Sequence, residues 1–193
     1  AIVFGMYHYM RRDPTTRTNR HRRLARMYYQ HFLGIDVMAL APRVTDAAAV
    51  TSKFEIPTMQ AADCVVCHKS VDPLAGLFQD YNEEGHLGPR KDGWYTDMFA
   101  AGFEGEDLPE EERWRSLQWL GERTARDPRF ATAIVEHVYY ILIGRKVLEA
   151  PEDIDDPMFG SRRRAYQEQR KLIEDVAERL VAEDFNLKEA FKG

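Results

Sequence analysis

Cysteine is scarce in this chain, whose 193 residues include only Cys64 and Cys67. Two cysteines three positions apart cannot build the multi-bridge framework that stabilises small secreted domains. No apolar run approaches the roughly 18 residues that a membrane helix requires, so we expect no membrane span. The sequence shows neither an internal repeat nor a low-complexity tract, which leaves a globular architecture as the expectation.

The chain also lacks a dominant charge sign. Its 27 Lys and Arg residues stand against 32 Asp and Glu residues, which gives a formal net charge of -5. This balance provides no overall attraction to nucleic acid, and we expect no nucleic-acid partner. Hydrophobic residues make up 44% of the chain and charged residues 31%, values that are ordinary for a soluble domain with a core of its own.

The first residues carry neither an initiator methionine nor the charged, apolar and small-residue pattern of a signal peptide. Ala1 is followed directly by apolar residues that suggest the interior of an element. Either a signal peptide has been removed or the chain is part of something longer, and we expect the second.

Hydrophobic spacing predicts a mainly α fold, because apolar residues recur at helical intervals and no alternating strand pattern is visible. Gly34 and Gly144 are expected to end helices, Asp127 and Ser161 to begin them, and Trp114, Leu117 and Leu120 to face inward. The last turns before Gly144 are expected to be buried. The predicted helices cover residues 20–32, 57–63, 72–81, 109–126, 130–143 and 161–183.

These helices suggest three regions. Residues 1–56 would hold an N-terminal helix and a surface link, residues 57–147 a cytochrome c-like helical haem domain, and residues 148–193 an acidic link with an amphipathic helix. The segment 85–98 is expected to be a glycine-rich loop.

The haem expectation comes from the run Cys64-Val65-Val66-Cys67-His68. Two thiols at this spacing can add to the two vinyl groups of one haem edge, and the following histidine can then bind the iron. A zinc site would need a second pair of ligands, and no further cysteine exists. A thioredoxin-like pair would need a βαβ unit, which the sequence does not suggest. One covalent haem c is therefore predicted, and its attachment implies a bacterial protein exported to the periplasm or the cell exterior.

The second iron ligand is predicted to be Met98, in a loop walled by Trp94 and Tyr95. Methionine opposite histidine is a common ligand pair in cytochromes c. The alternatives are an open coordination position or one of three other side chains, namely His86, Met59 and Met38, the last of which is expected to be buried.

The iron-bound histidine should donate its second ring N–H to a neighbouring acceptor. The carbonyl of Pro73, or of another residue in segment 71–74, is predicted to take this part. The pocket wall is expected to comprise Leu74, Leu77, Phe78 and Tyr81. The arginines of segment 20–26 would form either a solvated helix face or a contact for haem propionates or an acidic partner protein.

A family resemblance joins several of these features. The arginine-rich segment 19–34 comes first, and the CxxCH run follows it. Directly after this run come Asp72-Pro73-Leu74 and a segment with aromatic residues. Segment 127–145, with Gly-Arg at its end, comes last. In this order and spacing, residues 15–147 resemble the C-terminal c-type haem-binding segment of planctomycete-type secreted cytochrome proteins. Residues 75–76 read Ala-Gly where that family often has Gly-Phe, and few prolines precede Pro57. The resemblance implies a mono-haem cytochrome domain, and the tail from Pro151 lies outside it.

These observations predict an electron carrier rather than an enzyme. The chain would transfer electrons between redox protein partners within an exported protein or assembly. Two alternatives stay open. One is a haem enzyme subunit, peroxidase-like or coupled to a dehydrogenase, and the other is an assembly subunit whose haem is largely structural.

Overall fold

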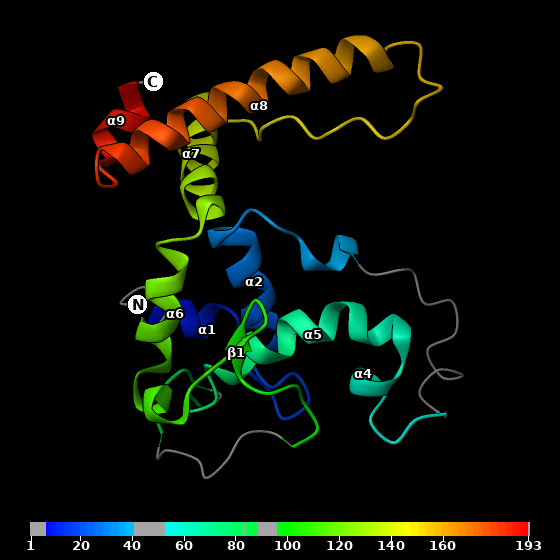
Figure 1. The fold of residues 1–193 in the computed structure, drawn as a ribbon, viewed down its shortest axis with the longest axis vertical. Helices are drawn as coiled ribbons and strands as arrows, with labels where there is room; N and C mark the ends of the chain where they lie inside the picture. The colour runs from blue at the N-terminus through cyan, green and yellow to red at the C-terminus, as the bar shows by residue number, and fades with distance from the viewer. Residues whose placement is uncertain (1–6, 41–52, 83, 89–95, 193) are drawn as a thin grey trace. The chain divides into compact units, whose positions relative to one another are not determined.

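The computed structural model describes residues 7–40, 53–82, 84–88 and 96–192 (Figure 1). Helices dominate this part of the chain, which confirms the mainly α class. None of the helices in these residues is long and apolar enough to cross a membrane. The chain divides into two compact units, one formed by Ala1–His31 with Ile35–Ala125 and the other by Phe32–Gly34 with Arg126–Gly193.

The first unit contains the described helices and strands that precede α7. In chain order they are α1 (Tyr7–Arg12), α2 (Arg22–Phe32, whose last residue belongs to the second unit), the 3-10 helix η1 (Val37–Leu40), α4 (Pro57–Gln60), α5 (Ala62–Gly76), strands β1 (Gly102–Phe103) and β2 (Glu106–Asp107), the 3-10 helix η2 (Glu110–Arg115) and α6 (Ser116–Thr124).

The core of the first unit forms around the buried stripe of α2. Tyr28 and Tyr29 are almost fully buried, and the ring centroids of both lie within 6.4 Å of that of Phe103 on β1. The hydroxyls of Tyr28 and Thr124 lie 2.6 Å apart, which connects α2 to the end of α6. A buried hydroxyl requires such a partner, so this hydrogen bond also fixes how α2 and α6 pack.

The motif helix α5 differs from the sequence expectation. We predicted that the cysteines would emerge at the end of one helix and that Pro73 would lie at the start of another. Instead, α4 ends at Gln60 and a single helix runs from Ala62 through Pro73 to Gly76. Proline removes one backbone donor from a helix interior, and here the helix ends three residues later. Cys64 and Cys67 therefore lie in the first two turns of α5.

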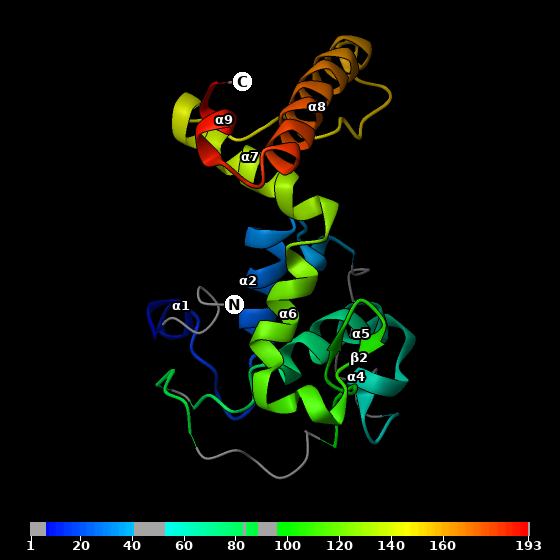
Figure 2. The same cartoon turned by 60° about the vertical axis from the view of Figure 1, so that its left-hand side comes forward.

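A small hairpin beside α5 is absent from the sequence expectation (Figure 2). Gly102 pairs with Asp107 and Phe103 with Glu106, and the two turn residues, Glu104 and Gly105, both have positive φ. Such a turn is typical of two-residue hairpins. Strands of two residues are too short to show an alternating pattern, which explains why the sequence did not reveal them.

The predicted helix at 109–126 is also divided, into η2 and α6. Leu117 and Leu120 are buried as expected, but the prediction for Trp114 was wrong, because that side chain is 71% exposed. Trp119 is buried instead. The change from 3-10 to α-helical geometry at Ser116 alters the angular spacing of side chains, so a stripe extrapolated at 3.6 residues per turn fails across it.

The second unit consists of α7 (Pro128–Ile143), α8 (Phe159–Ala182) and α9 (Leu187–Lys192). Asp127 caps α7 by accepting a hydrogen bond from the backbone of Arg129 at 2.9 Å. Gly144 ends α7 at φ 72°, a left-handed conformation that glycine adopts at low cost. Both boundaries confirm the sequence expectation. Ser161, predicted as a cap, lies inside α8, which begins at Phe159.

The core of the second unit lies between α7 and α8. Its buried side chains are Ala131, Val135, Val138, Ile173, Val176, Ala177, Leu180 and Ala190. The spacing of apolar residues in segment 161–183 predicts an inner face made of Tyr166, Ile173, Val176, Ala177 and Leu180. The structure confirms it, except that Tyr166 is only partly buried. Ile141 and Leu142 in the final turn of α7 were expected to be buried but are exposed, as are Tyr140 and Ile143 on either side of them. Four consecutive residues cover every side of a helical turn, so they cannot all join one stripe.

The units group residues differently from the three regions expected from the sequence. α1 and most of α2 belong to the same unit as the motif helix α5, which η1 contacts, and α7 packs on α8 in the other unit. These pairings depend on contacts between segments far apart in the chain.

The buried stripe of α8 can be tested at Leu180, which is fully buried, and its neighbour Val181, which is 51% exposed. Leu180→Ala should lower the free energy of unfolding by about 2–5 kcal/mol, because it leaves a cavity. Val181→Ala should change it by less than about 0.5 kcal/mol. Urea unfolding followed by circular dichroism measures both, and equal losses would contradict the assigned orientation of α8.

Candidate functional site

Both cysteines of the motif lie on one face of α5 together with His68. Cys64, Cys67, His68 and Val71 follow one another at helical positions i, i+3, i+4 and i+7, which bring side chains to the same side. Both cysteines are partly exposed, and neither is in a disulfide. One helix face thus carries two thiols and an imidazole.

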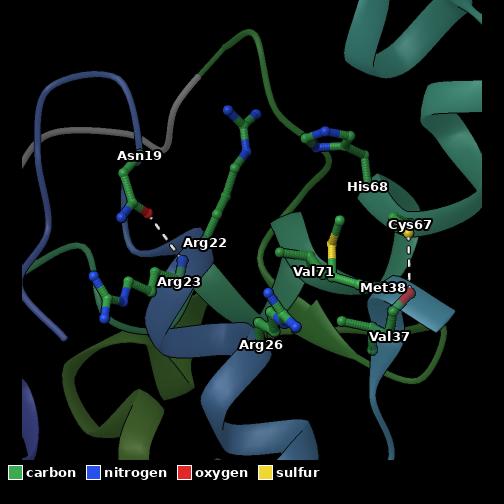
Figure 3. Close-up of a pocket in the computed structure, with 9 residues that line it drawn as sticks. All are labelled: Asn19, Arg22, Arg23, Arg26, Val37, Met38, Cys67, His68 and Val71. Carbon is green, nitrogen blue, oxygen red and sulfur yellow. Dashed lines mark hydrogen bonds between the residues drawn. The ribbon is translucent and has the colours of Figure 1, made fainter. Parts of the chain in front are cut away.

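A cavity of about 340 Å³ lies beside this face (Figure 3). It is formed by residues of α5, of η1, and of α2 with the turn before it. The lining residues are Asn19, Arg22, Arg23, Arg26, Val37, Met38, Cys67, His68 and Val71. Its volume falls in the range of about 300–1,000 Å³ that is common for small-molecule and cofactor sites.

The imidazole of His68 is held by a buried carboxylate. Nδ1 of His68 lies 2.8 Å from Oδ1 of Asp72, one helical turn further along α5. Arg22 of α2 donates to both oxygens of the same carboxylate, through Nε at 2.7 Å and Nη2 at 3.1 Å. The Asp72 side chain is fully buried, and a buried carboxylate requires such compensation.

These contacts determine the ionisation of Asp72. Burial by itself would raise the pKa of this carboxyl, but the hydrogen bonds from His68 and Arg22 and the charge of Arg22 outweigh it, and the pKa lies below its usual value. An ionised carboxylate can only accept hydrogen bonds. Nδ1 of His68 therefore carries the proton, and in the neutral ring Nε2 holds the lone pair that can bind a metal.

The partner of His68 differs from the sequence prediction. We expected the carbonyl of Pro73 or of a neighbouring residue to accept from the ring, whereas the side chain of Asp72 does so. The prediction placed Asp72 at a helix start. Once α5 is continuous, His68 and Asp72 become i and i+4 neighbours on one helix, a spacing that does bring side chains together.

Cys67 has the character of a protonated thiol. Its Sγ donates to the carbonyl of Val37 at 3.1 Å. Burial, together with the negative charge of Asp36, raises the pKa of this thiol. Thiolates bind metals and attack disulfides, whereas thiols do so poorly. The surroundings of Cys67 therefore disfavour thiolate–metal or thiol–disulfide exchange chemistry.

Three arginines of α2 line the cavity, and each is already ion-paired. Arg22 pairs with Asp72, Arg23 with Asp13, and Arg26 with Asp36. A guanidinium has five N–H donors, so these pairs leave donors for a further acceptor. Among the described residues, the cavity lining contains three cations and no carboxylate, a composition that suits an anionic or carboxylate-bearing ligand.

The predicted pocket wall does not line this cavity. Leu74, Leu77 and Phe78 are fully buried in the core, and Tyr81 is partly buried, with its carbonyl 3.1 Å from Nε2 of His21. Trp94 and Tyr95 lie outside the described residues.

The candidates for a second ligand lie in different environments. Met98, the preferred residue, is buried at 4% exposure and does not line the cavity. Met59 is on α4, and His86 is in an exposed turn in which its backbone N–H donates to Asn82. Met38 was expected to be buried, but it is 52% exposed and lines the cavity with His68.

Sequence reasoning placed Asp72 in the segment that accepts from His68 but missed the part played by its side chain, and it missed Val37 altogether. A signal for Asp72 existed in its spacing from His68, but none marked Val37, whose contribution is a backbone carbonyl. Within the described residues, no group of three or more His, Cys, Asp or Glu side chains is arranged to hold a metal ion. A haem iron needs only one or two protein ligands.

Comparison of the chain with protein-family models, with curated proteins and with solved structures finds no match. The function of the site must therefore be inferred from its own donors and geometry.

The ionised state of Asp72 predicts a pH-dependent contribution to stability. Its folded pKa is below the unfolded value, so the unfolded chain binds more protons between the two values, and the contribution is lost as the pH falls below about 4. Asp72→Asn should lower the free energy of unfolding at pH 7 by about 1–3 kcal/mol and make its decline with acid shallower.

The matched control is Asp63→Asn, at an exposed position in the first turn of the same helix. Urea unfolding between pH 3 and pH 7 compares the variants with the unmodified chain. Parallel stability curves for Asp72→Asn and the unmodified chain would show that the carboxylate contributes nothing that depends on its charge.

Proposed function

We propose that this chain binds one haem c through Cys64, Cys67 and His68 and transfers electrons between redox protein partners. The observation that carries the proposal is the orientation of His68, whose Nδ1 is held by Asp72 while the ring borders a cavity on the same helix face as the cysteines. A bound haem supplies an iron that changes reversibly between its ferrous and ferric states.

The thiols provide covalent attachment. Each thiol would add across one vinyl group of a haem, with sulfur bonded to one vinyl carbon and the thiol hydrogen transferred to the other. No electron is gained or lost in this addition, and no oxidant is required. Cys64 and Cys67 are free thiols on one helix face, which supports attachment of both to one edge of the same macrocycle.

His68 provides the iron ligand. Its ring is oriented by Asp72, which is itself oriented by Arg22. A carboxylate behind a ligating histidine fixes the ring and increases its basicity. This arrangement supports Nε2 as the ligating atom.

The cavity supports a haem better than it supports a small polar ligand. Val37, Met38 and Val71 offer apolar surface to a flat macrocycle, while the arginines of α2 offer donors to its carboxylates. A haem has an apolar ring and two carboxylates at one edge, so it matches a lining that has apolar residues on one side and arginines on the other. The redox partners and the export of the protein to the periplasm or the cell exterior are part of the same proposal, since covalent haem attachment takes place outside the bacterial cytoplasmic membrane.

The proposal is tested by producing the chain with an export signal in a bacterium that has c-type haem maturation machinery. We expect haem to remain with the polypeptide after denaturation, with the absorption bands of a c-type cytochrome. Cys64→Ala combined with Cys67→Ala should lose covalent haem. His137→Ala, an exposed histidine on α7, should retain it. Absence of covalent haem from the unmodified chain would end the proposal.

Electron transfer is tested separately from haem attachment. We expect reversible one-electron reduction and oxidation, and no binding of carbon monoxide by the native ferrous protein. Rapid binding of carbon monoxide would instead favour the haem-enzyme alternative, because it reports an open coordination position.

A further inference from the structure

We infer that Met38, rather than Met98, is the second iron ligand of this site. The inference rests on the proposed haem site and names a residue that would complete it. It starts from the cavity, whose lining includes a thioether sulfur and an imidazole contributed by elements far apart in the sequence. Figure 3 shows the side chain of Met38 rising from η1 into the space that also borders His68.

The donor set of the cavity singles out Met38. Three lining residues carry side-chain atoms suited to a haem iron or its attachment, namely Cys67, His68 and Met38. In the proposed function Cys67 is used for attachment and His68 for the first axial position. Among the described lining residues, Met38 is then the remaining one with a soft donor atom, and thioether sulfur is a common partner of histidine at the iron in cytochromes c.

The backbone that carries Met38 is held in place. Val37 is buried at 1% exposure, and the N–H of Met38 donates to Asp36 Oδ1 at 3.0 Å. The Asp36 carboxylate in turn accepts from Nε and Nη2 of Arg26 on α2. The side chain of Met38 is nevertheless 52% exposed. A fixed backbone with an unburied, unbranched side chain allows sulfur to find a ligand position at little cost in packing.

Haem attachment would itself release one restraint on this segment. Cys67 donates its thiol hydrogen to the carbonyl of Val37, the residue before Met38. A thioether has no such hydrogen, so this bond is lost once sulfur is joined to carbon. The segment then keeps the buried side chain of Val37 and the hydrogen bond from Met38 to Asp36 as restraints, and Met38 can adjust toward the iron after attachment.

The competing donors would each require a larger rearrangement. Met98 is 4% exposed and would have to leave the core, which brings buried apolar surface into water. Met59 and His86 lie on other segments and do not line the cavity. Met38 already lines the cavity, and its side chain is 52% exposed.

The test uses alanine variants of three methionines in the full chain carrying haem. The oxidised native protein should show the weak near-infrared band of sulfur bound to ferric iron. Met38→Ala should lose this band, convert the iron to a high-spin spectrum and bind added imidazole, whereas Met98→Ala and Met59→Ala should keep the band. Met38→His should restore a low-spin spectrum at a lower midpoint potential, because histidine replaces the thioether that raises it.

Folding is monitored by far-ultraviolet circular dichroism, which should be unchanged in Met38→Ala because the side chain is largely exposed. Persistence of the near-infrared band in Met38→Ala would overturn the inference. Loss of the band in Met98→Ala, while Met38→Ala keeps it, would do the same. So would a native protein that has no such band. In each of these cases covalent haem would still be present, so the proposed function would stand; a chain without haem would remove both.

Discussion

The hydrogen-bonded series from Arg22 through Asp72 to His68 is the interaction on which the rest of the site depends. It crosses from α2 to α5 and uses both oxygens of a fully buried carboxylate. Removing any member would leave a buried charge or donor without its partner, which is costly in a protein interior. The series therefore does two things at once: it fixes the packing of α2 against the motif helix, and it selects which nitrogen of His68 remains available for a metal.

The cavity acquires its chemical character from the way α2 and η1 flank this helix. Arginines approach from α2, whereas the apolar residues Val37 and Met38 approach from η1. Ion pairs with aspartates hold the guanidinium groups without using all of their donors. The result is a site with an apolar floor, a cationic border and an oriented imidazole, in a chain whose overall net charge is negative.

Much of the helical framework follows from local signals in the sequence. Asp127 caps a helix and Gly144 ends it because a carboxylate accepts an end N–H and glycine tolerates positive φ, and both effects act within a few residues. Pro73 and Trp114 show where such reasoning fails. Tertiary packing carries α5 through the proline, and a change of helical geometry turns the tryptophan outward.

The sequence by itself determined the spacing of Cys64, Cys67 and His68, on which the prediction of one haem rests, because that spacing is local and survives any arrangement of the remaining chain. Only the tertiary structure decided what surrounds them. Arg22 and Met38 lie tens of residues before the motif, and their approach to it depends on the packing of α2 and η1 on α5. Such long-range contacts leave no periodic or capping signal, so a single sequence does not reveal them.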